Sequence, residues 1–261
     1  MRHRSLLTCL TGLAVLLAAG CGGSGTPEAA APSSPPPSAA LPPEPAPSPT
    51  RAEPPKPKLR PLPKKLPTGL VRTTGTAKVA LTFDDGPDPA WTPKVLDRLK
   101  AAKVHATFCV VGSQVRKHPA LLQRIVREGH QLCNHSWNHD MDLGRRPVPE
   151  IRADLVRTSR EIRRAVPDAK VPFYRQPGGR WTTEVVQVAK QLDMRSLHWT
   201  VDPQDWAKPP AATIEKRVKR SARPGSVVLL HDGGGDRAAT LAACANLIAD
   251  LKRDHGVARL T

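Results

Sequence analysis

Two adjacent carboxylates, Asp84 and Asp85, end an apolar run that begins at Val79, and a Gly-Pro break follows them. This pattern predicts a buried strand over residues 79–83 that presents both carboxylates at its end. Neighbouring like charges repel each other unless a cation or an arginine lies beside them. The alternative is an Asp-rich turn, since Asp-Gly is a common turn signal. The choice depends on whether the rest of the chain supplies partners.

Two histidines are the first candidate partners. His135 and His139 are four residues apart, a spacing that on a helical turn places both imidazoles within reach of one metal ion. Alone, the pair is equally compatible with a surface turn. Together with an Asp from another strand end, it would form a three-ligand metal site with a position left for water, as in hydrolytic enzymes.

Catalytic residue types also follow three later predicted strands. Arg175 comes directly after an apolar run and could hold a carboxylate in a fixed orientation. Asp205 and His231 follow two further runs, and Asp202, which precedes Pro203, is expected to have a turn role. A charged turn or a hydrogen-bonding histidine would explain each residue alone. Five strand ends, in chain order and each with such residues, are hard to explain as unrelated turns.

The elements that must position these residues alternate between strand and helix. Strands are predicted over residues 79–83, 106–111, 131–134, 171–174, 195–200, 226–230 and 257–260. Helices are predicted over residues 92–102, 119–128, 150–165, 183–192, 211–222 and 239–252. The alternation indicates a parallel α/β architecture, and about seven units favour a barrel over an open sheet. In both architectures, sites lie at the carboxyl ends of the strands.

The composition is that of a chain with one sizeable core, since 39% of its 261 residues are hydrophobic and 3% are aromatic. Its formal net charge of +17 favours anionic partners, such as lipid head groups or cell-wall polymers. The sequence has no nucleic-acid-binding motif and no interleaving of basic with aromatic residues. Nucleic acid is therefore not expected as a partner.

The five cysteines do not have the spacing of a zinc ribbon. Cys109 lies in a segment typical of a core strand. For Cys109, Cys133 and Cys244 we favour buried free thiols. One disulfide among these three is the alternative.

Residues 1–20 have the features of an export signal, with a basic start and an apolar segment too short to span a bilayer. The end of this segment, Leu17-Ala18-Ala19-Gly20-Cys21, resembles the lipobox of bacterial lipoproteins, which implies lipidation of Cys21. The usual leucine is here one position early, at Leu17, and simple secretion is the alternative. We expect a lipoprotein anchored to the outer face of the cell membrane.

Residues 21–67 are rich in Pro, Ala and Ser. Repeated X-Pro steps exclude helices and sheet ladders, so we predict a disordered, semi-extended tether. Its basic end, residues 56–65, could lie on anionic lipid or polymer. The tether would hold a folded domain, residues 68–261, away from the membrane.

Five motifs together resemble those of a known family. In chain order they are Thr82-Phe83-Asp84-Asp85-Gly86, His135-Ser136-x-x-His139, Arg175-x-Pro177, Asp202-x-x-Asp205-Trp206 and Leu229-x-His231. This order is similar to that of the polysaccharide deacetylases, carbohydrate esterases of family four with the NodB homology domain. The resemblance covers residues 78–261 and implies a distorted β/α barrel that hydrolyses N-acetyl groups with the help of a metal.

The resemblance implies a division of labour between the paired carboxylates. Asp84 would be the general base, held by Arg175. Asp85, His135 and His139 would ligate a divalent metal. We favour zinc, with cobalt, manganese or nickel as alternatives, because this ligand set suits all four.

The resemblance places the acid and the substrate groove on later strands. His231 would be the general acid, oriented by Asp205, and Trp206 and Leu229 would wall the groove for the acetyl methyl group. A backbone N–H near Gly178 would bind the oxyanion. Many family members have an aromatic residue at this last position, so one wall of the sugar cleft could be absent here.

An extracellular N-acetylated polysaccharide is the substrate class implied, and the expected anchor favours peptidoglycan. Chitooligosaccharides and acetylated xylan are alternatives. A different hypothesis is a non-catalytic wall-binding lipoprotein on the same fold. We expect a monomer that contacts its polysaccharide, the membrane through its lipid, and anionic wall polymers through its charge.

Overall fold

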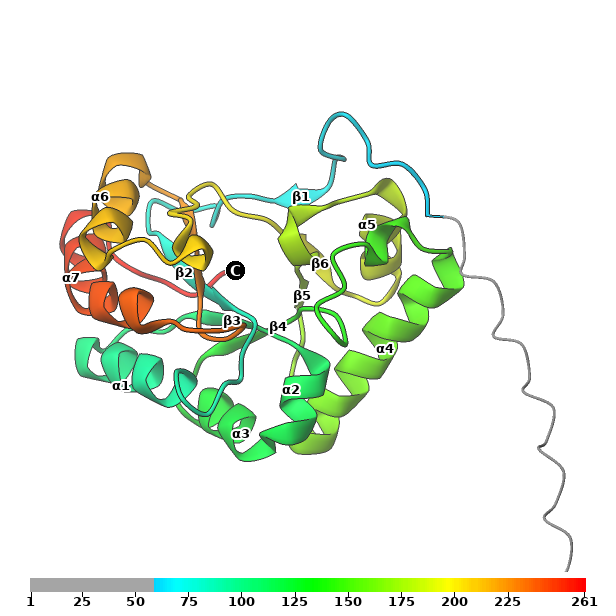
Figure 1. Cartoon of the computed structure of the whole chain (residues 1–261), viewed down its shortest axis with the longest axis horizontal. Coiled ribbons are helices and arrows are strands. Elements are labelled where there is room, and N and C mark those ends of the chain that lie inside the picture. The colour runs from blue at the N-terminus through cyan, green and yellow to red at the C-terminus, as the bar shows by residue number, and fades with distance from the viewer. Residues whose placement is uncertain (1–58) are drawn as a thin grey trace, which may run out of the picture. The chain divides into compact units, whose positions relative to one another are not determined.

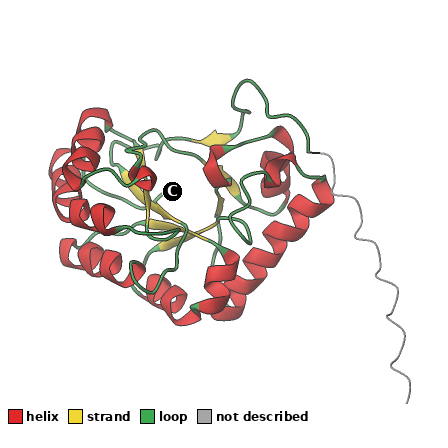
Figure 2. Cartoon of the chain, in the orientation of Figure 1, coloured by secondary structure: helices red, strands yellow, loops and turns green. Residues whose placement is uncertain are grey.

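A seven-stranded, wholly parallel sheet forms the centre of the fold, in the order β1-β6-β5-β4-β3-β2-β7. The computed structural model describes residues 59–261. Its strands are β1 (Leu70–Val71), β2 (Ala80–Asp84), β3 (Thr107–Val110), β4 (Gln131–Asn134), β5 (Phe173–Tyr174), β6 (Arg195–Leu197) and β7 (Val227–His231). The sheet is strongly curved, and the helices lie around its outside (Figures 1 and 2).

Helices connect nearly every pair of successive strands, as parallel pairing requires. They are α1 (Thr92–Ala102), α2 (Gly112–Lys117), α3 (Pro119–Arg127), α4 (Val148–Ala165), α5 (Thr183–Gln191), α6 (Ala211–Ser221) and α7 (Ala238–Asp254), with the short 3-10 helices η1 (Leu143–Arg145), η2 (Pro177–Gly179) and η3 (Asp205–Ala207). The two ends of the sheet are joined by isolated bridges, Thr73 with Ser226 and Val201 with Val228. The predicted distorted β/α barrel is thus confirmed.

Most predicted elements are present with small shifts of their ends. Helix α1 has the predicted bounds, and it buries Val95, Leu96 and Leu99 as expected. The short elements β1 and α2 were not predicted, because two and six residues are too few to show a periodic pattern. The strand predicted over residues 257–260 is wrong, since Val257 forms an isolated bridge with Val79.

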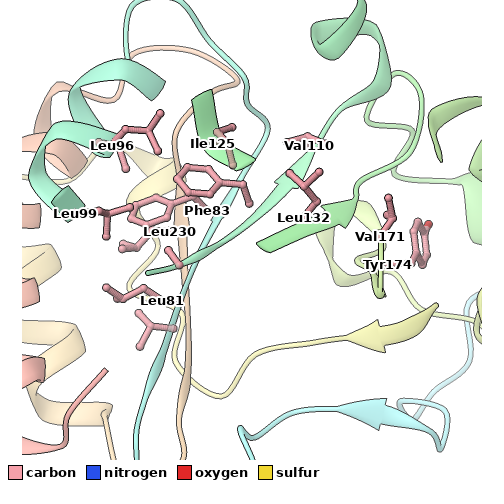
Figure 3. Packing of buried hydrophobic residues seen from close by; sticks show 14 of the residues in the cluster. Leu81, Phe83, Leu96, Leu99, Val110, Ile125, Leu132, Val171, Tyr174 and Leu230 are labelled. Atoms are coloured by element: carbon pink, nitrogen blue, oxygen red, sulfur yellow. The ribbon is translucent and has the colours of Figure 1, made fainter. Parts of the chain in front are cut away.

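Side chains along each strand alternate between two separate cores. Leu81 and Phe83 of β2 belong to the larger core, between the sheet and the helices, where they lie near Leu96 and Leu99 of α1 (Figure 3). Ala80 belongs to a smaller core inside the barrel. The alternation therefore turns Asp84, four residues after Ala80, toward the interior.

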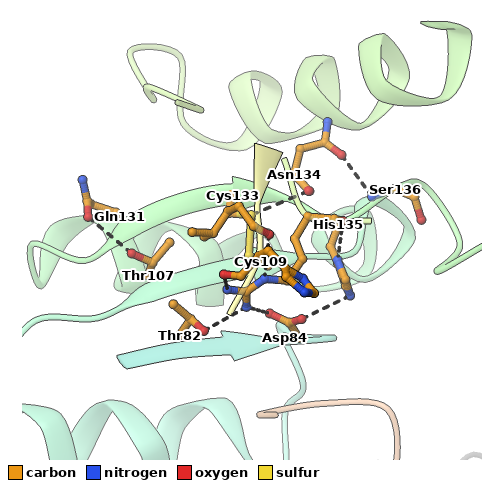
Figure 4. The surroundings of a disulfide bond; sticks show 12 residues. Thr82, Asp84, Thr107, Cys109, Gln131, Cys133, Asn134, His135 and Ser136 are labelled. Carbon is orange, nitrogen blue, oxygen red and sulfur yellow. Dashed lines mark hydrogen bonds and ion pairs between the residues drawn. A yellow bond between two sulfur atoms is a disulfide. The ribbon is translucent and has the colours of Figure 1, made fainter. Parts of the chain in front are cut away.

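Two interior cysteines form a disulfide, which makes the favoured free-thiol interpretation wrong for this pair. Cys109 of β3 lies opposite Cys133 of β4 in the register, and their Cα atoms are 4.1 Å apart (Figure 4). In-register neighbours on the same face of a sheet bring their thiols together, a fact that sequence spacing does not reveal. Cys244 is free and buried in α7, as predicted.

The predicted export signal, Cys21 and the tether as far as residue 58 lie outside the described residues. Arg60, near the predicted tether's end, is bonded to the domain. Its Nη2 donates to the carbonyls of Gly144 (3.3 Å) and Arg146 (2.6 Å), and its Nη1 lies 3.4 Å from Glu184 Oε1. Between residues 59 and 261, no helix is both long and apolar enough to cross a bilayer.

Candidate active site

Strand alternation collects the predicted catalytic residues at one opening of the barrel. Asp84 pairs with His231 across β2 and β7, both at carboxyl ends. His135 follows the interior Cys133 by two residues, and Arg175 follows the interior Phe173 by two. Because side chains two residues apart share a face, all four groups point into the barrel, and Asp84, His135 and His231 line its mouth.

Arg175 holds Asp84 from inside the barrel. The arginine is fully buried, and its Nη1 donates to Asp84 Oδ1 at 2.6 Å and to Thr82 Oγ1 at 2.8 Å. Its Nε donates to the carbonyl of Leu197 at 3.3 Å. The Thr82 hydroxyl in turn donates to the carbonyl of Val228. This network fixes one oxygen of Asp84 and neutralises its charge in a dry environment.

The backbone of Asp85 departs from the extended conformation of the strand, and this changes the direction of its side chain. Its φ of 76° is left-handed, so the carboxylate turns into the mouth instead of toward the outer core. Its Oδ1 lies 3.5 Å from His135 Nε2 and 3.3 Å from His139 Nε2. Ligand atoms of these three residues all lie within 4.8 Å of one another.

The two histidines converge through a turn, so the predicted helical arrangement is wrong. The segment between them has no regular structure, and both Ser136 (φ 63°) and His139 (φ 57°) are left-handed. The imidazole centroids are 5.0 Å apart. The spacing of four thus yields the expected proximity by a different backbone path.

These three residues fit a divalent cation. Asp85 Oδ1 is buried and has no hydrogen-bond partner among the described residues. His135 Nδ1 lies 2.8 Å from the carbonyl of Arg175, which can only accept, so the proton resides there and the Nε2 lone pair faces Asp85. One carboxylate and two imidazoles are a common zinc-type donor set.

The protonation states agree with a metal site. Burial alone would raise the pKa of Asp85, but His135, His231 and His139 together lower it well below its usual range. Burial, followed by the neighbouring His135, lowers the pKa of His139. The carboxylate is therefore ionised and the His139 imidazole neutral, the forms in which they ligate metals.

On the other side of the mouth, Asp205 holds His231. Asp205 is 1% exposed, and its Oδ1 lies 2.7 Å from His231 Nδ1. Its Oδ2 accepts from the backbone N–H of His231 and from the Thr240 hydroxyl, both at 2.9 Å. Burial alone would lower the pKa of His231, but the hydrogen bond and charge of Asp205, with Asp85 and Asp84, raise it to about 9.

A pocket of about 350 Å³ opens above these groups. Its lining residues are Asp84, Asp85, His135, His139, Met141, Gly178, Trp199, Asp202, Trp206, Leu229 and His231. Leu229 is 3% exposed and Trp206 is 50% exposed, so the leucine forms a floor and the tryptophan a solvent-facing edge. Asp202 also accepts from the backbone N–H of Gln204, which agrees with its expected turn role.

Known proteins are similar to this chain in sequence and in fold. The polysaccharide deacetylase family model matches residues 71–197. The chitooligosaccharide deacetylase of Bradyrhizobium sp. (strain ANU 289) is 44% identical over 170 residues, which cover 64% of this chain and 77% of that protein. A peptidoglycan-N-acetylglucosamine deacetylase of Bacillus cereus is 37% identical over 177 residues, covering 67% and 82%. The chain belongs to the polysaccharide deacetylase family.

A solved structure within this family shows why the site matters as much as the fold. A pseudoenzyme of carbohydrate esterase family four from Bacillus anthracis matches with a TM-score of 0.68 and 29% identity, over 75% of this chain and 68% of that chain. The polysaccharide deacetylase fold is therefore compatible with a protein called a pseudoenzyme. In the present chain every predicted catalytic and metal-site residue lies in the mouth or directly contacts a residue that does.

Four residues of this deacetylase that support or line the site were not predicted from the sequence to do so. Thr82 and Thr240 bond to Arg175 and Asp205, while Met141 and Trp199 line the pocket. A signal existed for Thr82, which lies two residues before Asp84 and hence on the same face. Met141, Trp199 and Thr240 lie in loops or a helix, where no sequence period indicates what a side chain contacts.

Proposed function

We propose that the chain is a metal-dependent deacetylase that hydrolyses N-acetyl groups of an extracellular polysaccharide, with peptidoglycan the favoured substrate. One observation carries the proposal: a single pocket holds a three-residue metal set between a base held by arginine and an acid held by carboxylate. Relatives called chitooligosaccharide and peptidoglycan deacetylases support the substrate class. Both act on chains that contain N-acetylglucosamine units.

Asp84 is suited to accept the proton of the attacking water. Arg175 occupies its Oδ1 at 2.6 Å, and its Oδ2 faces the metal set, 3.6 Å from His135 Nε2. One oxygen of the carboxylate is thus bonded to Arg175, and the other faces the place where water must be activated. As water attacks the acetyl carbonyl, a C–O bond forms and the proton moves to Asp84.

Asp85, His135 and His139 would hold the divalent cation, with zinc favoured and cobalt, manganese or nickel as alternatives. When bound, such an ion lowers the pKa of water and polarises the acetyl carbonyl. The backbone N–H near Gly178, in the wall of the pocket, would be a second donor to the oxyanion.

His231 completes the reaction by protonating the leaving nitrogen. Asp205 keeps its imidazole protonated at neutral pH, since the pKa of His231 is about 9. When the C–N bond breaks, the nitrogen takes this proton, and the products are acetate and a free amine on the sugar. The base and the acid have neighbours of opposite charge, Arg175 beside Asp84 and Asp205 beside His231.

The expected location is part of this proposal. Lipidation at Cys21 and the Pro-rich tether would hold the domain outside the cell membrane. The Cys109–Cys133 disulfide supports an oxidising compartment, and the net charge of +17 supports contact with anionic wall polymers. We favour an anchored monomer, with secretion as the alternative.

Acetate release tests the proposal. The purified full chain is treated with a chelator, reloaded with Zn²⁺, Co²⁺, Mn²⁺ or Ni²⁺, and assayed on peptidoglycan, chitooligosaccharides and acetylated xylan. We expect metal-dependent release that Asp84→Asn abolishes. No release from any substrate with any metal would refute the deacetylase and favour a wall-binding protein. Equal release by Asp84→Asn would refute the assigned base.

A further inference from the structure

Two exposed apolar side chains line the pocket. Among residues 59–261, the large hydrophobic side chains exposed to solvent are Leu62, Leu66, Met141, Val148 and Trp206. Of these, Met141 and Trp206 line the pocket. Exposed apolar groups beside catalytic groups are typical of a surface that a ligand covers.

Met141 fills the space next to Gly178. A Cβ atom at residue 178 would lie 2.6 Å from Met141 Cε, and the backbone of Gly178 is left-handed, with φ 61°. Residue 178 therefore contributes backbone alone to the wall of the pocket. The thioether of Met141, from the loop after β4, supplies the side chain at this point.

The loop that bears Met141 is fixed by buried groups. Gln176 Nε2 donates to the carbonyls of Asp140 (3.3 Å) and Met141 (3.2 Å). Tyr174 holds Gln176 in place, since its hydroxyl donates to Gln176 Oε1 at 2.5 Å. Tyr174 and Gln176 are both fully buried. The backbone of Met141 is thus held in a fixed position, although 44% of the surface of Met141 is exposed.

The pocket thus has polar catalytic groups inside it and an apolar edge that includes Met141 and Trp206. A pyranose ring has the matching character, with C–H groups on its faces and hydroxyl groups around its rim. A thioether is polarizable and adapts to such a surface. We propose that Met141 is a specificity-determining residue that packs against the apolar face of an N-acetylhexosamine unit. This inference rests on the proposed function, and it assigns a contact of the sugar rather than of the acetyl group.

Steady-state kinetics of the zinc-loaded full chain test the inference. Met141→Ala is compared with the wild type on penta-N-acetylchitopentaose and on 4-nitrophenyl acetate, a small ester without a sugar. We expect KM for the oligosaccharide to rise about tenfold, with kcat nearly unchanged, because a contact made equally in the ground and transition states affects binding alone. Values for the small ester should not change. Met141→Leu should restore most of the affinity.

The controls separate a sugar contact from damage to the nearby metal site. Leu66→Ala removes an equally exposed side chain (47%) outside the pocket and should leave KM unaltered. Zinc affinity, measured by calorimetry, should be the same in wild type and Met141→Ala. An unchanged KM for the oligosaccharide, or equal losses on both substrates, would overturn the inference.

Acetate release by the wild type shows whether the proposed function itself has failed, separately from the sugar contact. If it releases no acetate, calorimetric binding of penta-N-acetylchitopentaose to wild type and Met141→Ala still decides the point. About tenfold weaker binding by the variant supports the sugar contact. Equal binding, or no binding to the wild type, refutes it.

Discussion

Replacing Asp205 by Asn should convert His231 from an acid into a neutral imidazole. A pKa of about 9 in place of the ordinary 6.5 corresponds to about 3 kcal/mol of preferential stabilisation of the imidazolium. Asp205 is the largest of the groups that raise this pKa, through its hydrogen bond and charge at 2.7 Å from Nδ1. Without this charge, burial opposes only the more weakly acting Asp85 and Asp84, so we expect the pKa of His231 to return to about its ordinary value. At about pH 7.5, roughly one tenth of the imidazole or less would then be protonated.

The expected result is a shift of the alkaline limb of the kcat/KM profile on a soluble chitooligosaccharide. In the wild type, activity should fall as pH rises through about 9. In Asp205→Asn it should fall near or below pH 6.5, with a loss of about tenfold or more at pH 7.5. Titration of the His231 ring by NMR gives the same pKa directly, even where activity is too low to measure.

Asp202→Asn is the matched control. It removes a carboxylate charge from the lining of the pocket, but Asp205 still holds His231, so its alkaline limb should stay near pH 9. An unshifted limb and an unshifted NMR titration in Asp205→Asn would refute the assignment of Asp205 as the group that keeps His231 protonated.

The same charge pair affects stability. The folded-state pKa of His231 is raised above its unfolded value, so its stabilising contribution is complete below about pH 6.5. It is lost as pH rises through about 9. The free energy of unfolding of the wild type should therefore decline over this interval more steeply than that of Asp205→Asn. Parallel curves from urea titrations at several pH values would contradict this.

Three further changes probe the groups around the site. Arg175→Lys should lower the free energy of unfolding by about 3 kcal/mol and abolish activity, because one ammonium cannot replace a buried guanidinium that donates to Asp84, to Thr82 and to the carbonyl of Leu197; denaturant curves with an unchanged midpoint would disprove this. Replacing Cys109 and Cys133 together by Ala should cost about 3 kcal/mol, and reductant should lower the wild-type melting temperature but not that of the variant. Arg60→Ala should lower stability by about 1 kcal/mol without changing kcat, whereas a large fall in kcat would show coupling to the site.

The part of this site that follows strand periodicity was predictable from sequence. The alternation of β2 explains both the outward Phe83 and the inward Asp84. The same rule, applied to runs that end in His135, Arg175 and His231, places all the strand-end groups at one opening. No knowledge of side-chain packing is needed for this step, because parallel strands have their carboxyl ends at the same edge.

What could not be predicted depends on backbone conformations that break the period. His139 reaches His135 through left-handed residues, not through a helical turn. The disulfide depends on the register between β3 and β4, and Met141 depends on a loop tied down by Gln176. Each of these features is set by contacts between segments distant in sequence, on which local patterns carry no information.

The adjacent residues Asp84 and Asp85 show how strand alternation and an irregular backbone conformation together build the site. Regular alternation would send Asp85 to the outer core, where an ionised carboxylate is unfavourable. Its left-handed φ of 76° turns it back into the mouth, and Gly233 makes room, since a Cβ there would lie 2.5 Å from the Asp85 carbonyl oxygen. The two neighbouring negative charges can then coexist because a different group lies beside each carboxylate. Arg175 neutralises Asp84 from within the barrel, while Asp85 lies beside His135 and His139. A cation held by these three residues would lie next to Asp84, the carboxylate that we propose as the base.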